Sequence, residues 1–273
     1  MQPVAFLGRD IHTYLESARE SVGKYLHTDK SNLVFVPNAT HGINIVAHSL
    51  QFKPGAEILG TDHEYGAMER TWAYVSKKNG WTYRQHPISL PVDDPDFYTG
   101  NFHKWLCAPK GSAFLYARPD KQALIEPLVV SWGYESDTPG ISTFQDYLEW
   151  TGTQDFSPYL SVPAAIEFQS SHNWNTVRKA CHSLASDALS QWAEKTVLPQ
   201  LYASDPWFAQ MVTLPIPNQF PPDVLQKRLL DEFHIEIPVI SWQHRSFVRL
   251  SVQGYNSPAE IQQLLEALQE LFF

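Results

Sequence analysis

The residues best suited to chemistry in this 273-residue chain are a histidine and a lysine side by side, His103 and Lys104. Phe102 precedes the pair and Trp105 follows it, so the lysine has aromatic neighbours on both sides. An apolar environment pushes the pKa of a lysine downward, and a neutral amine can attack a carbonyl carbon to form a Schiff base. The alternative is that Lys104 extends its amine into solvent at the end of a strand. From these residues alone both interpretations stay open.

The segment from His103 to Gly111 reads His-Lys-Trp-Leu-Cys-Ala-Pro-Lys-Gly and resembles the cofactor-lysine segment of class V pyridoxal-phosphate enzymes, particularly the isopenicillin N epimerase-like branch. The resemblance implies that pyridoxal 5'-phosphate is the cofactor. It also implies that Lys104, and not Lys110, binds the cofactor covalently and is the catalytic residue. His103 is then expected to contact the phosphate, and Asn101 is expected in the same cofactor site.

Upstream, an apolar run at Asn32–Pro37 predicts a strand, and a small polar turn at Asn38–Asn44 leads into a helix. A helix N-terminus after such a turn suits a phosphate group, although Asn38 and Thr40 could simply cap the helix. The segment resembles the phosphate-binding turn of the same family, which implies that Ala39 and Thr40 contact phosphate.

The turn Asp62-His-Glu-Tyr lies where the family places a ring flat on the cofactor, which points to Tyr65 and, more weakly, to His63. A stacked aromatic ring would restrain the pyridine, whereas the plain alternative is a tyrosine packed beneath a turn. The Gly-Thr pair at Gly152 and Thr153 resembles the motif that reaches the phosphate of the other subunit, which implies a homodimer. Helix capping is the alternative for that pair.

Arg249 lies in the apolar strand pattern Ser246–Gln253, where a guanidinium requires a carboxylate or phosphate partner. A structural ion pair would meet that requirement. The strand also resembles the one whose arginine holds the substrate α-carboxylate, which implies substrate binding by Arg249. No cysteine occurs between Ile237 and Phe247, where desulfurases of the family carry their nucleophile, and this disfavours a desulfurase.

Compared with the family, the chain is shortened between about residues 92 and 96. The missing part would hold strands, a helix and the aspartate that pairs with the pyridine nitrogen, the partner that makes the ring an electron sink. Asp93, Asp94 and Asp96 lie nearby, but a solvated acidic loop explains them better. Loss of the central strands would expose apolar surface and strand edges.

Composition narrows the class of protein further. A net charge of −9 argues against nucleic-acid binding, because phosphate recognition uses clustered basic residues. No apolar run approaches a membrane span, and we expect no signal peptide. Two cysteines, Cys107 and Cys181, provide neither a disulfide framework nor metal-ligand spacing, so we expect a cytoplasmic protein without a metal site.

The expected fold is α/β, a fold-type I pyridoxal-phosphate transferase whose large domain is shortened, followed by a C-terminal α+β domain. The boundary is expected between residues 1–170 and 171–273. Further predicted elements are helices at 10–27, 120–126, 159–168, 174–201, 222–233 and from Ser257 on, and strands at 57–61, 80–91, 112–117, 211–217 and 235–240.

The resemblance implies a dimeric enzyme that acts at the Cα of a small-molecule amino acid, most simply as an epimerase or racemase. A C–S lyase would use the same cofactor chemistry and stays open. The shortened segment supports another class: a degenerate or truncated homologue that retains only cofactor binding or dimerisation.

Overall fold

The computed structural model describes residues 6–61, 64–86, 95–202 and 208–273. The chain divides into two compact units, Met1–Ser170 and Ser171–Phe273. Among the described residues, no helix is both long enough and apolar enough to cross a membrane.

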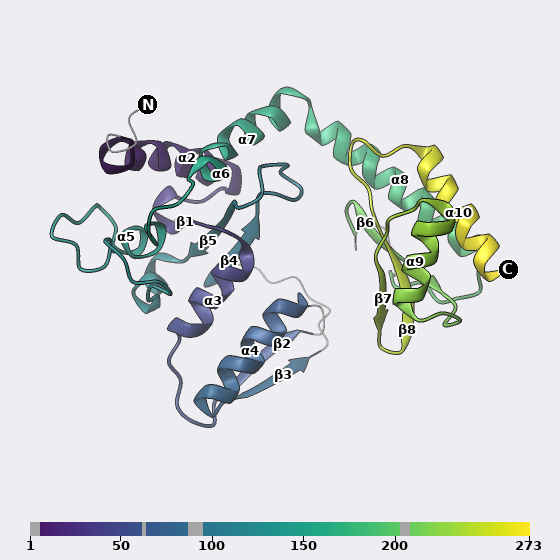
Figure 1. The fold of residues 1–273 in the computed structure, drawn as a ribbon, viewed down its shortest axis with the longest axis horizontal. Helices are drawn as coiled ribbons and strands as arrows, with labels where there is room; N and C mark the ends of the chain where they lie inside the picture. Colours follow the sequence, from purple (N-terminus) through teal and green to yellow (C-terminus); the bar gives the residue numbers. More distant parts are fainter. Residues whose placement is uncertain (1–5, 62–63, 87–94, 203–207) are drawn as a thin grey trace. The chain divides into compact units, whose positions relative to one another are not determined.

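The first unit contains two separate sheets and the helices that cover them (Figure 1). Its helices are α2 (Ile11–Leu26), α3 (Ala39–Ser49), α4 (Gly66–Asn79), α5 (Thr143–Glu149), α6 (Ser157–Leu160) and α7 (Val162–Ser171). Its strands are β1 (Leu33–Val36), β2 (Glu57–Thr61), β3 (Thr82–His86), β4 (Phe97–Asn101) and β5 (Ala113–Ala117). Shorter helical turns occur at Phe6–Asp10, Lys30–Asn32 and Pro119–Leu124.

The larger of the two sheets has the order β1-β5-β4, and β5 runs antiparallel to both neighbours. Alternate side chains of β1 enter two different apolar clusters, as the period of a strand requires. Leu33 and Phe35 pack with residues of α2, whereas Val34 and Val36 pack with residues of α3 and α5. A sheet buried on both faces explains why β1 reads as a continuous apolar run.

The second sheet pairs β2 with β3 in parallel and lies beside α4. In the described part of the chain β4 pairs only with β5, and β2 only with β3. The open strands carry large exposed apolar side chains: Leu59 is 71% exposed and Tyr98 is 56% exposed. These exposed strands agree with the expectation that a shortened sheet leaves apolar surface and edges uncovered.

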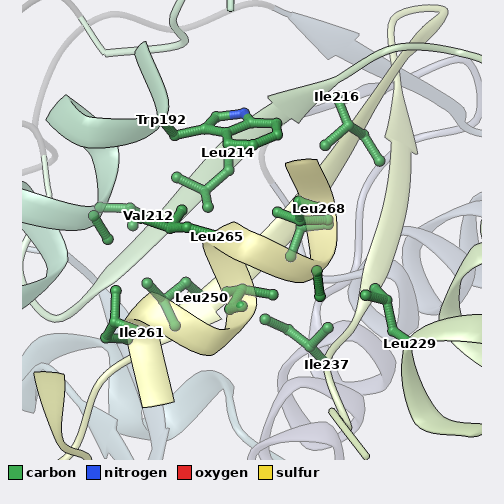
Figure 2. Packing of buried hydrophobic residues seen from close by; sticks show 14 of the residues in the cluster. Trp192, Val212, Leu214, Ile216, Leu229, Ile237, Leu250, Ile261, Leu265 and Leu268 are labelled. Carbon is green, nitrogen blue, oxygen red and sulfur yellow. The ribbon is translucent and has the colours of Figure 1, made fainter. Parts of the chain in front are cut away.

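The second unit is an antiparallel sheet, ordered β6-β8-β7, packed against three helices. Its strands are β6 (Met211–Ile216), β7 (Val239–Trp242) and β8 (Arg245–Ser251), and its helices are α8 (Trp174–Lys195), α9 (Pro222–Phe233) and α10 (Pro258–Phe272). Figure 2 shows its core, in which Trp192 lies near Leu214 and Leu265. Trp192 is fully buried and its Nε1 donates to the Pro215 carbonyl at 2.7 Å, so its polar atom is satisfied.

Several predicted element bounds differ from the structure. The helix from Trp174 ends at Lys195 and not at residue 201, because Thr196 already has extended backbone angles. The predicted strand at 235–240 is wrong over its first half: the Ile235 N–H closes the C-terminus of α9 by donating to the Leu229 carbonyl. Pro238 has no N–H to give to a strand ladder, and pairing begins at Val239.

Candidate functional site

Lys104 lies in the connection between β4 and β5. Three backbone hydrogen bonds close this connection: Phe102 N–H to the Ser112 carbonyl (3.1 Å), Cys107 N–H to the Lys104 carbonyl (3.0 Å) and Ala108 N–H to the Phe102 carbonyl (3.1 Å). Phe102 and Leu106 fill the interior beneath the turn, whereas Lys104 is exposed. Of the two interpretations that the residues left open, the single chain matches the one in which Lys104 extends into solvent, because Phe102 and Leu106 take the buried positions of this turn.

The aromatic ring of Tyr65 faces the Lys104 amine. Tyr65 immediately precedes α4, and the Lys104 Nζ lies 5.6 Å from the centre of its ring. That distance is typical of an ammonium attracted by the face of a ring. Within the described residues, no carboxylate pairs with the Lys104 amine, so the amine is accessible to a reactant. Tyr65 is itself 64% exposed, which excludes the alternative of a tyrosine packed beneath its turn. His63 lies outside the described residues.

His103 has a polar atom for which the described structure provides no partner. Its Nδ1 atom is buried and makes no hydrogen bond within the described residues. Buried polar atoms are nearly always hydrogen-bonded, so an unsatisfied one beside an exposed lysine requires an explanation. A ligand that supplies an acceptor oxygen would satisfy a protonated Nδ1.

The first turn of α3 is held by two asparagine side chains. Asn38 caps the helix, with its Oδ1 accepting from the His41 N–H at 2.8 Å. Asn101, at the end of β4, accepts from the Ala39 N–H at 2.9 Å. The capping alternative therefore holds for Asn38. A phosphate could use the Ala39 N–H only if Asn101 turned aside, whereas Thr40 is half-buried at the same helix end.

His41 continues this turn and is partly buried. Burial lowers the pKa of its imidazole below the ordinary value of 6.5, because desolvation disfavours the charged form. A neutral histidine thus lies one residue beyond Thr40. Sequence reasoning did not single out His41, since one histidine in a helical pattern has no distinguishing neighbour.

Gly152 and Thr153 lie in the loop between α5 and α6. Gly152 has a φ of 122°, a conformation in which a side chain would be strained, and Thr153 is exposed. The helix-capping alternative is wrong for this pair, because Phe156 is the residue that precedes α6 and Asp155 accepts from the Ser157 N–H at 2.8 Å. The loop presents Thr153 to solvent and leaves Gly152 half-buried.

Arg249 lies in the second unit, on β8. Its backbone N–H donates to the Pro238 carbonyl at 3.0 Å, and its side chain is exposed. Nowhere in the described ranges does a carboxylate form an ion pair with its guanidinium, so the structural ion-pair alternative finds no support. The guanidinium is available for a carboxylate ligand.

Sequence reasoning missed a buried ion pair in the first unit. Arg19 of α2 pairs with Glu149 of α5, and both side chains are only 10% exposed. The two residues are 130 positions apart, so no local pattern could have connected them. Within this unit the structure therefore brings Lys104 to Tyr65, Asn101 to Ala39, and Arg19 to Glu149.

Comparisons with known proteins show which proteins this chain is similar to. A family model described as aminotransferase class V matches residues 3–90. Isopenicillin N epimerase from Amycolatopsis lactamdurans is 27% identical over 351 aligned positions, which cover 98% of this chain and 88% of the relative. A probable chloroplastic L-cysteine desulfhydrase from Arabidopsis thaliana is 31% identical over 195 positions, covering 64% of this chain and 40% of that protein.

Among solved structures, the cystine C–S lyase C-DES, in complex with its product cysteine persulfide, superposes with a TM-score of 0.79. It is 19% identical, and the superposition covers 98% of this chain and 88% of the lyase. This likeness confirms the predicted fold class. The epimerase alignment is longer than the 273 residues of this chain, so the relative carries residues that this chain lacks. The chain is therefore similar to class V aminotransferases over residues 3–90, and it has a shortened version of the fold that C-DES shows.

Proposed function

We propose that this protein binds pyridoxal 5'-phosphate through Lys104 and acts at the Cα of an amino acid, with an epimerase or racemase reaction as its chemistry. The observation that carries the proposal is the Lys104 amine, which has no acidic partner in the described part of the chain and lies 5.6 Å from the Tyr65 ring. The isopenicillin N epimerase relative, aligned over nearly the whole chain, supports the choice of reaction.

The residues of the first unit fit the cofactor in three respects. The free Lys104 amine suits an aldehyde, the exposed Tyr65 ring suits a flat pyridine, and the unsatisfied Nδ1 of His103 suits a phosphate oxygen. Thr40 and Asn101 line the start of α3, where a helix N-terminus favours an anion. These residues would hold the cofactor on one protomer.

When bound, pyridoxal phosphate supplies an electron-withdrawing ring that weakens the bonds to the substrate Cα. Once the substrate amine has replaced it on the cofactor, the Lys104 amine would act as general base and remove the Cα proton. Return of a proton to the opposite face of Cα would complete an epimerisation. Arg249 holds the substrate carboxylate through its planar fork of donors. In a homodimer, Gly152 and Thr153 of each protomer contribute to the phosphate site of the other.

A second candidate function follows from the question of which carboxylate would pair with the pyridine nitrogen. Asp93 and Asp94 lie outside the described residues. Asp96 pairs with Arg118 at 2.7 Å and lies 3.8 Å from the Lys121 amine, so it is already engaged. Without an acidic partner for the ring nitrogen, the protein would retain the cofactor without turning over a substrate.

A third candidate is a C–S lyase. The Arabidopsis desulfhydrase and the C-DES structure favour it, since removal of a group from Cβ begins with the same loss of the Cα proton. Lys104 would be the base in that reaction too. The position of the departing group, and not the lysine, separates the two reactions.

The first experiment measures cofactor attachment. Wild type mixed with pyridoxal phosphate should absorb near ~420 nm, and borohydride should fix the cofactor on a peptide that contains Lys104. Lys104→Ala should lose both signals, whereas Lys110→Ala, six residues further on and also exposed, should keep them. Attachment at Lys110, or no attachment in wild type, would contradict the proposal.

The second experiment measures turnover. Wild type with cofactor in deuterated water should exchange the Cα proton of an amino acid and interconvert its enantiomers. Release of sulfide from cysteine would select the lyase instead. Bound cofactor with no exchange on any amino acid tested would select the degenerate homologue.

A further inference from the structure

In the part of the chain that the structure describes, one edge of β1 is completed by side chains and not by a strand. β1 pairs with β5 along one side, and α5 packs along β1 as well. Gln145 Nε2 donates to the carbonyls of Lys30 (3.0 Å) and Leu33 (3.2 Å), and the Phe35 N–H donates to Glu149 Oε1 at 3.0 Å. Backbone groups at a buried sheet edge must find partners, so α5 takes the place of a neighbouring strand.

The second oxygen of Glu149 binds Arg19, so one carboxylate joins α2, β1 and α5. Burial raises the pKa of Glu149, and the Arg19 guanidinium and the Phe35 N–H oppose that shift only in part. Removing one member of a buried pair is strongly destabilising, whereas replacing both members by apolar residues is often neutral. Double variants that remove both charges can therefore separate the contribution of Glu149 to overall stability from its contribution to the position of nearby segments.

The place of these contacts in the chain gives them a functional meaning. Phe35 lies four residues before Ala39, at the base of the turn that leads to Thr40. Glu149 lies at the end of α5, at the base of the loop that carries Gly152 and Thr153. Gln154 Nε2 donates to the Glu149 carbonyl at 3.1 Å and closes that loop onto its base. The Glu149 carboxylate is thus hydrogen-bonded at the base of one candidate phosphate-binding segment, and its own residue is the base of the other.

We propose that Glu149 is a positioning residue that holds the Gly152–Thr153 loop in register with the Ala39–Thr40 turn. The inference rests on the proposed cofactor function, and it adds that the positions of these two segments are coupled through Glu149. A protomer that holds its own cofactor with one segment presents the other segment to its partner in a fixed position. The hydrogen bond from the Phe35 N–H to Glu149 fixes the position of one segment relative to the other. The ion pair between Glu149 and Arg19 stabilises the folded unit as a whole.

Two double variants separate these roles. Arg19→Met with Glu149→Gln removes both charges and keeps an oxygen for the Phe35 N–H. Arg19→Met with Glu149→Met removes both charges and that oxygen. We expect the Gln variant to unfold in urea close to the wild-type midpoint, because it leaves no buried charge unpaired. The Met variant should unfold at a modestly lower urea concentration, because the Phe35 N–H also loses its acceptor.

The two double variants should differ in their affinity for the cofactor. The Gln variant should bind pyridoxal phosphate within about twofold of wild type. The Met variant should bind about fivefold more weakly than the Gln variant, in the range expected for the loss of one neutral hydrogen bond. Absorbance near ~420 nm measures binding. Equal affinity in both variants, or affinity that simply follows the unfolding midpoint, would overturn the inference.

Amide hydrogen exchange of the cofactor-free protein gives a readout that needs no cofactor. In the Met variant the Phe35 amide and the amides of residues 150–154 should exchange faster than in the Gln variant. Unchanged exchange at residues 150–154 would refute the coupling even if wild type binds cofactor. If wild type takes up no pyridoxal phosphate, the proposed function fails, and faster exchange in both segments would still support the coupling.

Discussion

Gly42 provides a sharp test of how α3 is placed against β4. It is buried in the second turn of α3, and a Cβ built on it would lie 2.5 Å from Thr99 Oγ1 and 3.1 Å from Thr99 Cβ. The Thr99 hydroxyl donates to the Phe114 carbonyl at 2.7 Å, so the threonine cannot rotate away without losing that bond. Gly42→Ala must therefore move the helix or break the hydrogen bond.

The magnitude follows from two opposing effects. Overpacking of a filled interior costs about 1–3 kcal/mol. Alanine is favoured over glycine in a helix interior by about 1 kcal/mol. The Cβ would lie 2.5 Å from an atom that a hydrogen bond holds in place, so the overpacking cost should fall in the upper part of its range, about 2–3 kcal/mol. The net expectation is that Gly42→Ala lowers the free energy of unfolding by about 1–2 kcal/mol. A displaced α3 would also move Ala39 and Thr40 away from the other proposed cofactor-binding residues, so cofactor uptake should weaken as well.

Urea unfolding followed by circular dichroism measures this change, with Gly66→Ala as the matched control. Gly66 begins α4, and a Cβ there would meet nothing within 4 Å. The control should be neutral or up to about 1 kcal/mol more stable. If Gly42→Ala proved as stable as wild type, or no less stable than Gly66→Ala, the close approach of α3 to β4 would be refuted.

Two further predictions concern pH and capping. Because burial lowers the pKa of His41, the unfolded chain takes up its proton first, and His41 should cost stability as the pH falls below 6.5. His41→Gln should flatten the dependence of unfolding free energy on pH below that value, and an unchanged slope would contradict the burial. Ser257 and Glu260 form a reciprocal capping box at the start of α10, so Ser257→Ala should cost about 1 kcal/mol. Exposed Ser251→Ala is its control, and equal losses in urea unfolding would disprove the cap.

Local patterns succeeded where neighbours in sequence are also neighbours in space. The continuous apolar run predicted β1, and helical spacing predicted α9 with its observed bounds. The series Ser257-Pro-Ala-Glu predicted the start of α10, where the capping box forms. The resemblance of the lysine segment pointed to the family, because a motif of nine residues is specific even in a shortened chain.

The exposure of Lys104 was not readable from its aromatic neighbours, because the fold decides which residues of a turn face inward. The way in which α5 covers the second edge of β1 likewise has no local signal. Its partners, Gln145 and Glu149, come from a helix more than a hundred residues away in the chain.

The sequence by itself indicated the resemblance to class V pyridoxal-phosphate enzymes, the kinds of elements in each half and the lysine proposed to carry the chemistry, since these depend on residue identity and short spacing. Only the tertiary structure decided that Tyr65 faces Lys104, that Asn101 engages the first turn of α3, and that Glu149 joins three elements. The physical reason is that those contacts link positions far apart in the chain, and packing of the whole unit, not local preference, determines which distant groups meet.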